Sequence, residues 1–98
     1  MAELRYSIAA QSDLAEIEEY GARQFGPDAA EAYARDIVRA LNLLVRYPYS
    51  APARPDYGDG IRSKLVREHL ILHKIDAEGV FVVRVLHHSR DIARQLRK

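Results

Sequence analysis

The feature that most constrains this chain is a change in the spacing of its apolar residues near residue 60. Before it, apolar side chains recur every three to four residues, the period of a helix that buries one face. After it, apolar and polar residues alternate, the period of a strand. The stretch between, residues 49–60, is YSAPARPDYGDG and predicts a surface loop. We therefore expect helices first and a sheet afterwards.

Two helices are predicted in the first half, after a short strand over residues 5–9. Ser12 is expected to cap the first helix, whose buried stripe comprises Leu14, Ile17, Gly21 and Phe25. Pro27 suits the first position of a second helix, which should run to about residue 47 and stop before Pro48. Only a Gly-Pro turn separates the two helices, so they should form an antiparallel hairpin.

Three antiparallel strands are predicted in the second half, at residues 61–66, 69–75 and 80–87. Their turns fall at residues 67–68 and 76–79, and Ser89 should cap a short helix in the tail. The fold class is therefore α+β, with the order β-α-α-β-β-β, a helix hairpin on one face of a small sheet, and one domain over residues 1–98.

Composition indicates the compartment of the protein and the charge of its partner. The chain has no cysteine, no apolar run long enough to cross a membrane, and no signal-peptide pattern at its start, so we expect a cytoplasmic protein. Residues 1–56 hold 6 basic and 9 acidic side chains, a net charge of −3, whereas residues 57–98 hold 9 and 5, a net charge of +4. The second half should therefore attract an acidic or anionic partner.

The predicted turns assign side chains to the two faces of the sheet. Pairing His73 with Val82 and Ile71 with Arg84 gives one apolar face, which the helices should cover: Ile61, Ser63, Leu65, Leu70, Leu72, Phe81, Val83 and Val85. The opposite, open face would then present the polar residues Arg62, Lys64, His69, His73 and Arg84. A turn shifted by one residue would move Arg62 and Lys64 to the other face.

Cations on an open sheet face indicate a surface for an anionic or acidic partner. The alternative is that Asp59, Glu68 or Asp91 folds over and neutralises them. No metal site or cofactor is expected, because His87 and His88 should point to opposite faces and His69 and His73 should lie about 13 Å apart. RNA cleavage would need Arg62, Lys64, Arg84 and His87 to act together, and no tyrosine follows Tyr57 to move a proton.

The order of these segments resembles the ParE branch of the ParE/RelE toxin superfamily. The resemblance rests on SDLAEIEEY, the helix AEAYARDIVRALNLL, GIRSKLVREHLILHKI, and VFVVRVLHHSRD, and it extends over nearly the whole chain. Within it, Gly60-Ile61-Arg62 and Arg84-Val85-Leu86-His87 with the nearby Arg90-Asp91 are the most specific pieces.

The resemblance implies a type II toxin that poisons DNA gyrase without being an enzyme and is held inactive by a ParD-like antitoxin. It implies no sequence-specific nucleic-acid binding. The expected binding residues are Arg62, Lys64, His73, Arg84, His87, His88, Arg90, Asp91 and Arg94. Two alternatives remain open, a RelE-like ribosome-dependent mRNA endonuclease and a divergent interaction module without toxicity.

Overall fold

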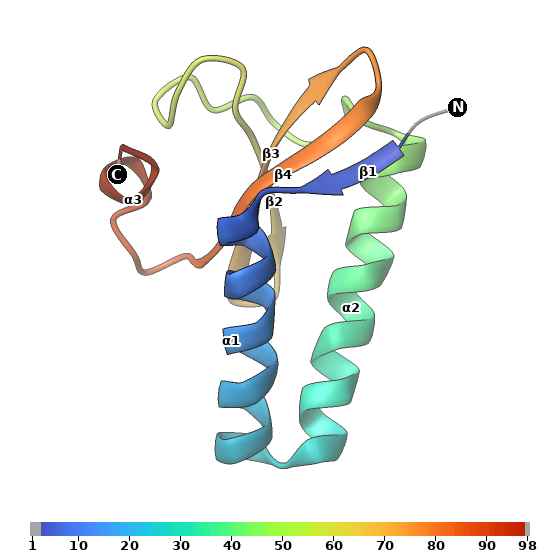
Figure 1. Ribbon diagram of the computed structural model, residues 1–98, viewed down its shortest axis with the longest axis vertical. Coiled ribbons are helices and arrows are strands. Elements are labelled where there is room, and N and C mark those ends of the chain that lie inside the picture. Colours follow the sequence, from blue (N-terminus) through green and yellow to red (C-terminus); the bar gives the residue numbers. More distant parts are fainter. Residues whose placement is uncertain (1–2, 98) are drawn as a thin grey trace.

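A computed structural model describes residues 3–97, and its elements follow the predicted order (Figure 1). They are β1 (Glu3–Tyr6), α1 (Ile8–Phe25), α2 (Pro27–Arg46), β2 (Arg62–Val66), β3 (His69–Asp76), β4 (Gly79–His87) and α3 (Ile92–Leu96). The α+β class and the helix hairpin are confirmed. The helices α1 and α2 run side by side and extend beyond the end of the sheet (Figure 1). None of the helices within residues 3–97 is both long and apolar enough to span a bilayer.

Two helices begin at residues other than those predicted. Ser7, not Ser12, caps α1: its hydroxyl oxygen accepts from the Ala10 N–H at 2.9 Å and its O–H donates to the Val83 carbonyl at 2.6 Å. A cap that also bonds β4 fixes the helix to the sheet, and it ends the first strand at Tyr6. Likewise Asp91, not Ser89, caps α3 by accepting from the Arg94 N–H.

The strands form one sheet in the order β1-β4-β3-β2. β1 pairs with β4 in parallel, a placement that the sequence left open, and the other two pairings are antiparallel, as predicted. The predicted register of β2 on β3 is confirmed, with Arg62 opposite His73. β1 comes so close to Gly79, whose φ is 137°, that any side chain there would collide with the Glu3 carbonyl.

The predicted pairing of Ile71 with Arg84 was wrong because β4 contains an extra residue. His73 faces Val82 as predicted, but Leu72 faces Arg84 and Ile71 faces Val85, so Val83 is a bulge. One inserted residue reverses the faces of the residues after it. Arg84 therefore lies on the face opposite to Arg62 and Lys64.

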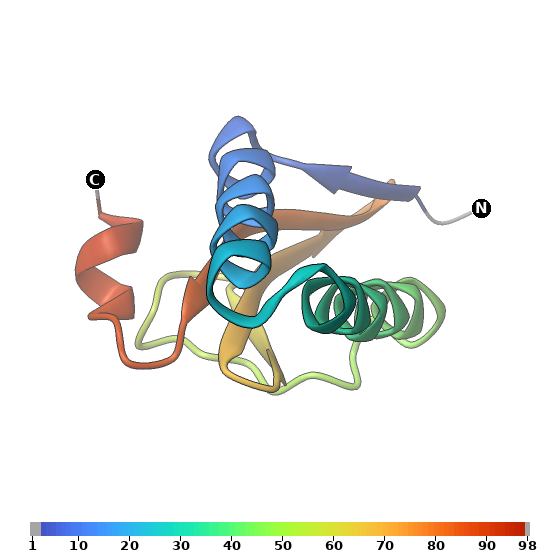
Figure 2. The ribbon, with the colours of Figure 1, turned by 90° about the horizontal axis from the view of Figure 1, so that it is seen from below.

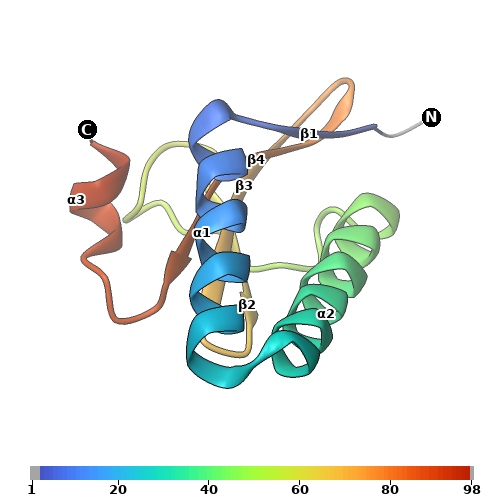
Figure 3. The same cartoon turned by 60° about the horizontal axis from the view of Figure 1, so that its bottom comes forward.

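The face assignment for the helices was also wrong. The helices cover the face that contains Val66, Ile71, Val80, Val82 and Val85, where they contribute Ala10, Ile37, Ala40, Leu41 and Leu44. The other face has a second, smaller core of Ile61, Leu72, Leu86 and Ile92, with Tyr57 packed against it. The loop before β2 and the tail helix thus cover part of the face predicted to be under the helices, and α2 and α3 lie on opposite sides of the strands (Figures 2 and 3).

Candidate functional site

The basic surface predicted on an open sheet face is not formed. Arg62 and Lys64 share a face with His73 and Ile71, the face under the helices, whereas Arg84 is paired with Leu72 on the other face. All three cations are only partly exposed. The predicted nuclease set of Arg62, Lys64, Arg84 and His87 is therefore not brought together on one surface.

Arg62 and His73 belong to the interior rather than to a recognition surface. The Arg62 Nη1 donates to the Ala51 carbonyl at 2.7 Å, and its guanidinium lies 5.0 Å from the centre of the Tyr49 ring. His73 is fully buried, with Nδ1 3.0 Å from the Ile71 carbonyl, and its Nε2 has no partner among the described residues. Burial, and secondarily the charge of Arg62, lowers the pKa of His73.

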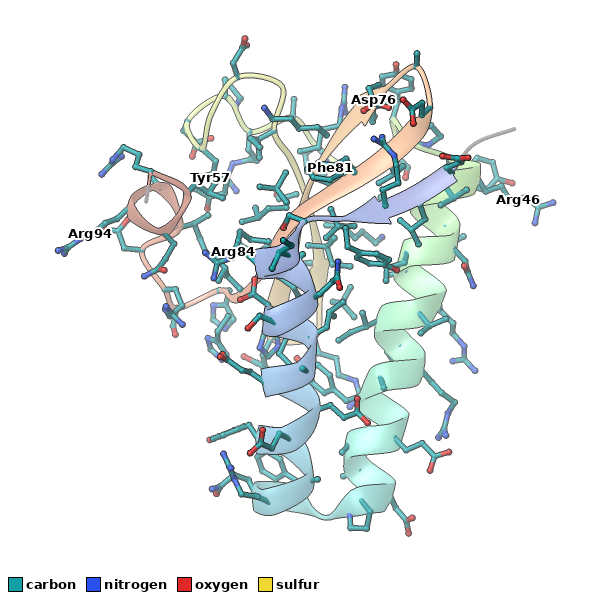
Figure 4. The ribbon with its side chains drawn as sticks, in the orientation of Figure 1. Arg46, Tyr57, Asp76, Phe81, Arg84 and Arg94 are labelled. Atoms are coloured by element: carbon teal, nitrogen blue, oxygen red, sulfur yellow. The ribbon has the colours of Figure 1, made fainter. Side chains whose placement is uncertain are left out.

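Arg84 is held by a carboxylate that sequence reasoning missed. Its Nε and Nη2 donate to the two carboxylate oxygens of Asp13 at 2.7 and 2.8 Å, beside the first turns of α1 (Figure 4). One of those oxygens also accepts from the Val85 N–H at 3.0 Å. β1 pairs only with Gly79–Val82, so Asp13 supplies the acceptor that a neighbouring strand would otherwise give to Val85. The hydrogen bonds that Arg84 donates to the Asp13 carboxylate raise the pKa of Arg84.

A cluster of histidines lies where the β2–β3 turn meets the end of β4. The Tyr33 hydroxyl is 2.6 Å from His69 Nδ1 and also accepts from the Glu68 N–H. The His69 and His87 rings are 5.3 Å apart, edge to face. Burial, and then the nearby His87, lowers the pKa of His69, and burial raises the pKa of Tyr33.

The expectation that His87 and His88 point in opposite directions was wrong. Their rings are stacked, with centroids 4.7 Å apart and an interplanar angle of 24°. Strand alternation does not apply, because β4 ends at His87 and the His88 N–H donates to the Glu68 carbonyl at 2.9 Å. His88 Nε2 then lies 2.8 Å from the Glu68 carboxylate. The two imidazoles and this carboxylate share one corner of the molecule.

An apolar groove of about 720 Å³ is lined by α1 and α2 and by residues near the end of β4. Its walls include large apolar side chains that remain exposed: Tyr20 at 55%, Phe25 at 70% and Val38 at 54%. Glu68, His69 and His87 of the histidine cluster also line the groove, together with Arg90. An exposed apolar surface of this kind indicates a protein partner.

The tail holds the remaining predicted residues. Asp91 caps α3 and so has a structural role, while Ile92 is buried in the second core. Arg90 and Arg94 are exposed. Figure 4 shows Arg94 on α3, far from Arg46 at the end of α2. Arg90 and Arg94 therefore face solvent, whereas the Arg62 and Arg84 side chains are hydrogen-bonded within the protein.

Two solved structures from toxin–antitoxin systems share this architecture. The "Chromosomal ParDE TA system from P. aeruginosa" aligns with a TM-score of 0.77 and 20% identity, over 89% of this chain and 96% of that one. The "E.coli DinJ-YafQ complex" aligns with a TM-score of 0.61 and 14% identity, over 91% and 96%. At these identities the likeness establishes the fold, which is the ParE/RelE-like toxin fold.

Sequence similarity is more specific. The profile described as "ParE toxin of type II toxin-antitoxin system, parDE" matches residues 4–92. Toxin ParE1 of Mycobacterium tuberculosis H37Rv is 33% identical over 91 residues, 92% of this chain and 93% of that protein. Toxin ParE1 of Caulobacter vibrioides is 25% identical over 92 residues, 94% and 95%. The chain belongs to the ParE toxin family of type II toxin–antitoxin systems, which confirms the resemblance.

Proposed function

We propose that this protein is a toxin that inhibits DNA gyrase by binding it, and that a ParD-like antitoxin neutralises it. Family membership supports the class of activity. One structural observation favours binding over RNA cleavage: both carboxylate oxygens of Asp13 hold the Arg84 guanidinium, and Arg62 and Lys64 lie on the opposite face. The ribosome-dependent nuclease therefore has less support. Gyrase acts on the chromosome, so the proposed compartment is the cytoplasm.

The surface that we favour for binding gyrase is the basic tail after β4, which contains Arg90 and Arg94. Arg90 and Arg94 are exposed and make no ion pair within the described chain, whereas Arg84 pairs with Asp13 and Arg62 donates to the Ala51 carbonyl. Exposed arginines can donate several hydrogen bonds to acidic partner groups, and arginine is common among residues that dominate binding energy. The tail is also held in place, because Ile92 anchors α3 in the second core.

The target is tested with purified protein in a gyrase supercoiling assay that also measures linear, cleaved plasmid. We expect inhibition by the wild type, and an inhibitory concentration at least about tenfold higher for Arg94→Ala, the loss of one arginine contact worth about 1.4 kcal/mol. The matched control is Arg46→Ala, an exposed arginine at the end of α2. Unaffected gyrase with codon-specific mRNA cleavage on ribosomes would favour the nuclease instead.

The groove between α1 and α2 is the proposed antitoxin site. An amphipathic helix lays its apolar face into such a groove, and here it would cover Tyr20, Phe25 and Val38. Arg90, which also lines the groove, would meet an acidic residue on that helix. An amphipathic antitoxin helix suits the shape and the apolar walls of the groove. An antitoxin partner also agrees with membership of a toxin–antitoxin family.

The antitoxin site is tested by binding to the protein encoded by the adjacent reading frame. Val38→Glu puts a charge on a wall of the groove and should weaken binding at least about tenfold, since a charge without a partner is costly to bury. Leu65→Glu is the control, because Leu65 is exposed to a similar extent, 57% against 54%, and does not line the groove. Equal affinities of both variants would contradict this site.

A further inference from the structure

The corner formed by Glu68, His87 and His88 has the geometry of a metal site. The Glu68 Oε2 lies 2.8 Å from His88 Nε2 and 3.9 Å from His87 Nε2. One ligand atom from each residue lies within 4.8 Å of the other two. We infer that these three side chains bind a single Zn²⁺ ion, with solvent or a partner group completing the coordination.

The separations are close to those that zinc requires. Tetrahedral coordination with bonds of about 2.0–2.1 Å places ligand atoms roughly 3.3 Å apart. The Glu68–His88 contact must lengthen and the Glu68–His87 contact must shorten, each by less than about 1 Å. The ligand atoms of His87 and His88 lie within 4.8 Å of each other, and all three side chains are at least 40% exposed, so they can rotate toward a common ion.

The backbone already brings the ligands together. The β2–β3 turn presents Glu68, and the His88 N–H donates to the Glu68 carbonyl at 2.9 Å. The Glu68 N–H is in turn fixed by the Tyr33 hydroxyl, which rises from α2. Three separate elements therefore hold this corner, and a site built on hydrogen-bonded segments loses less entropy on binding than one on free side chains.

A second residue can orient the His87 ring. Its Nδ1 lies 2.7 Å from the Ser89 hydroxyl oxygen and 3.1 Å from the Ser89 nitrogen. In the metal-free protein Nδ1 accepts from the Ser89 N–H; coordination through Nε2 moves the ring proton to Nδ1, so that bond is lost and the Ser89 hydroxyl oxygen becomes the acceptor of the ring N–H. Metal-bound histidines commonly donate their other ring N–H in this way, which fixes the tautomer.

The donor set indicates the kind of metal. Two imidazoles and one carboxylate suit zinc and related transition metals, whereas calcium and magnesium prefer oxygen ligands alone. Three protein ligands with an open position form an exchangeable site rather than a closed structural one. This inference does not depend on the gyrase or antitoxin proposals, although Glu68 and His87 also line the groove.

Calorimetric titration of tag-free protein with zinc chloride tests the site. We expect one ion per chain with a dissociation constant on the order of micromolar, and an affinity at least about tenfold lower for His88→Ala and for Glu68→Gln. The matched control is Glu78→Gln, because Glu78 lies in the other hairpin turn and its side chain is 67% exposed against 63% for Glu68. Its affinity should equal that of the wild type.

Nitrogen-15 NMR of the imidazoles gives a readout that does not depend on affinity. Zinc should shift the Nε2 resonances of His87 and His88 and leave those of the buried His73 unchanged. Circular dichroism checks that each variant is folded, and Glu68→Gln keeps the test decisive if His88→Ala does not fold. Millimolar or weaker binding by the wild type, or equal binding by wild type, Glu68→Gln and any folded His88→Ala, would overturn the inference.

Discussion

Replacing Asp13 with alanine should destabilise the protein strongly. The Asp13 side chain is only 9% exposed and accepts three hydrogen bonds, two from Arg84 and one from the Val85 N–H. Alanine leaves the Val85 N–H without a partner, at a cost of about 1–3 kcal/mol. It also leaves the guanidinium without its counter-charge.

The magnitude follows from the exposure of the pair. Breaking a fully buried ion pair costs about 3–5 kcal/mol, but the Arg84 side chain is 23% exposed, so water compensates part of the loss. Since the two losses share one carboxylate, they do not simply add, and we expect about 3 kcal/mol in total for Asp13→Ala. For a domain of this size that lowers the melting temperature by roughly 12–24 °C.

Urea unfolding followed by circular dichroism measures this loss. Asp13→Asn keeps an oxygen that can accept from the Val85 N–H and should cost about half as much. The comparison separates the effect of losing the charge from the effect of losing this acceptor. Glu16→Ala, an exposed change on the same helix, should stay within about 0.5 kcal/mol. A loss below about 1 kcal/mol for Asp13→Ala would refute the reasoning, because the carboxylate would then not be supporting the edge of β4.

Three further predictions concern stability. Burial lowers the pKa of His69 and His73, so below about pH 6.5 the unfolded chain binds protons that the folded chain does not. The free energy of unfolding should therefore fall as the pH drops from 7 to 5, by at most about 1.4 kcal/mol per pH unit for each group. A urea midpoint that does not change with pH would contradict this. Gly79→Ala should cost more than 2 kcal/mol and expose the β1 amides to hydrogen exchange, because the alanine side chain would meet the backbone of β1. The control Gly60→Ala places its methyl group in open space at φ 77° and should cost only about 1 kcal/mol. Ile92→Ala should cost about 2–4 kcal/mol in the same urea assay, so removal of residues 89–98 should destabilise the core; an unchanged midpoint would show that α3 is not part of it.

The sequence predicted features that depend on local spacing. The Pro27 helix start, the strand ends at Val66 and His69, and the pairing of Arg62 with His73 follow from turn residues and from alternation, and the structure confirms them. The cap at Ser7 was missed because the alternation of residues 5–9 predicted a strand there, whereas β1 ends at Tyr6. The second bond of Ser7, to the Val83 carbonyl, arises only after the sheet forms.

The errors about the site have one physical origin. Nothing in the residues around Val83 marks a bulge, yet that single insertion moves Arg84 to the other face, next to Asp13. Both faces of the sheet are also apolar enough to be covered, so alternation could not show which one the helices choose. Asp13 could have been suspected as a partner, because it lies four residues before Ile17 and so shares the buried side of α1.

These errors change where recognition can occur. A core of this size needs its strand edges and buried cations satisfied, and Asp13 and the Ala51 carbonyl hold Arg84 and Arg62 for that purpose. Of the four arginines expected to contact a partner, only Arg90 and Arg94 remain free within the described residues, and both are on the tail. If the antitoxin occupies the groove and gyrase meets the tail as proposed, Arg90 is the residue common to both, because it lines the groove and begins the path to α3. An antitoxin helix could then exclude the target by covering Arg90 alone, without reaching Arg94.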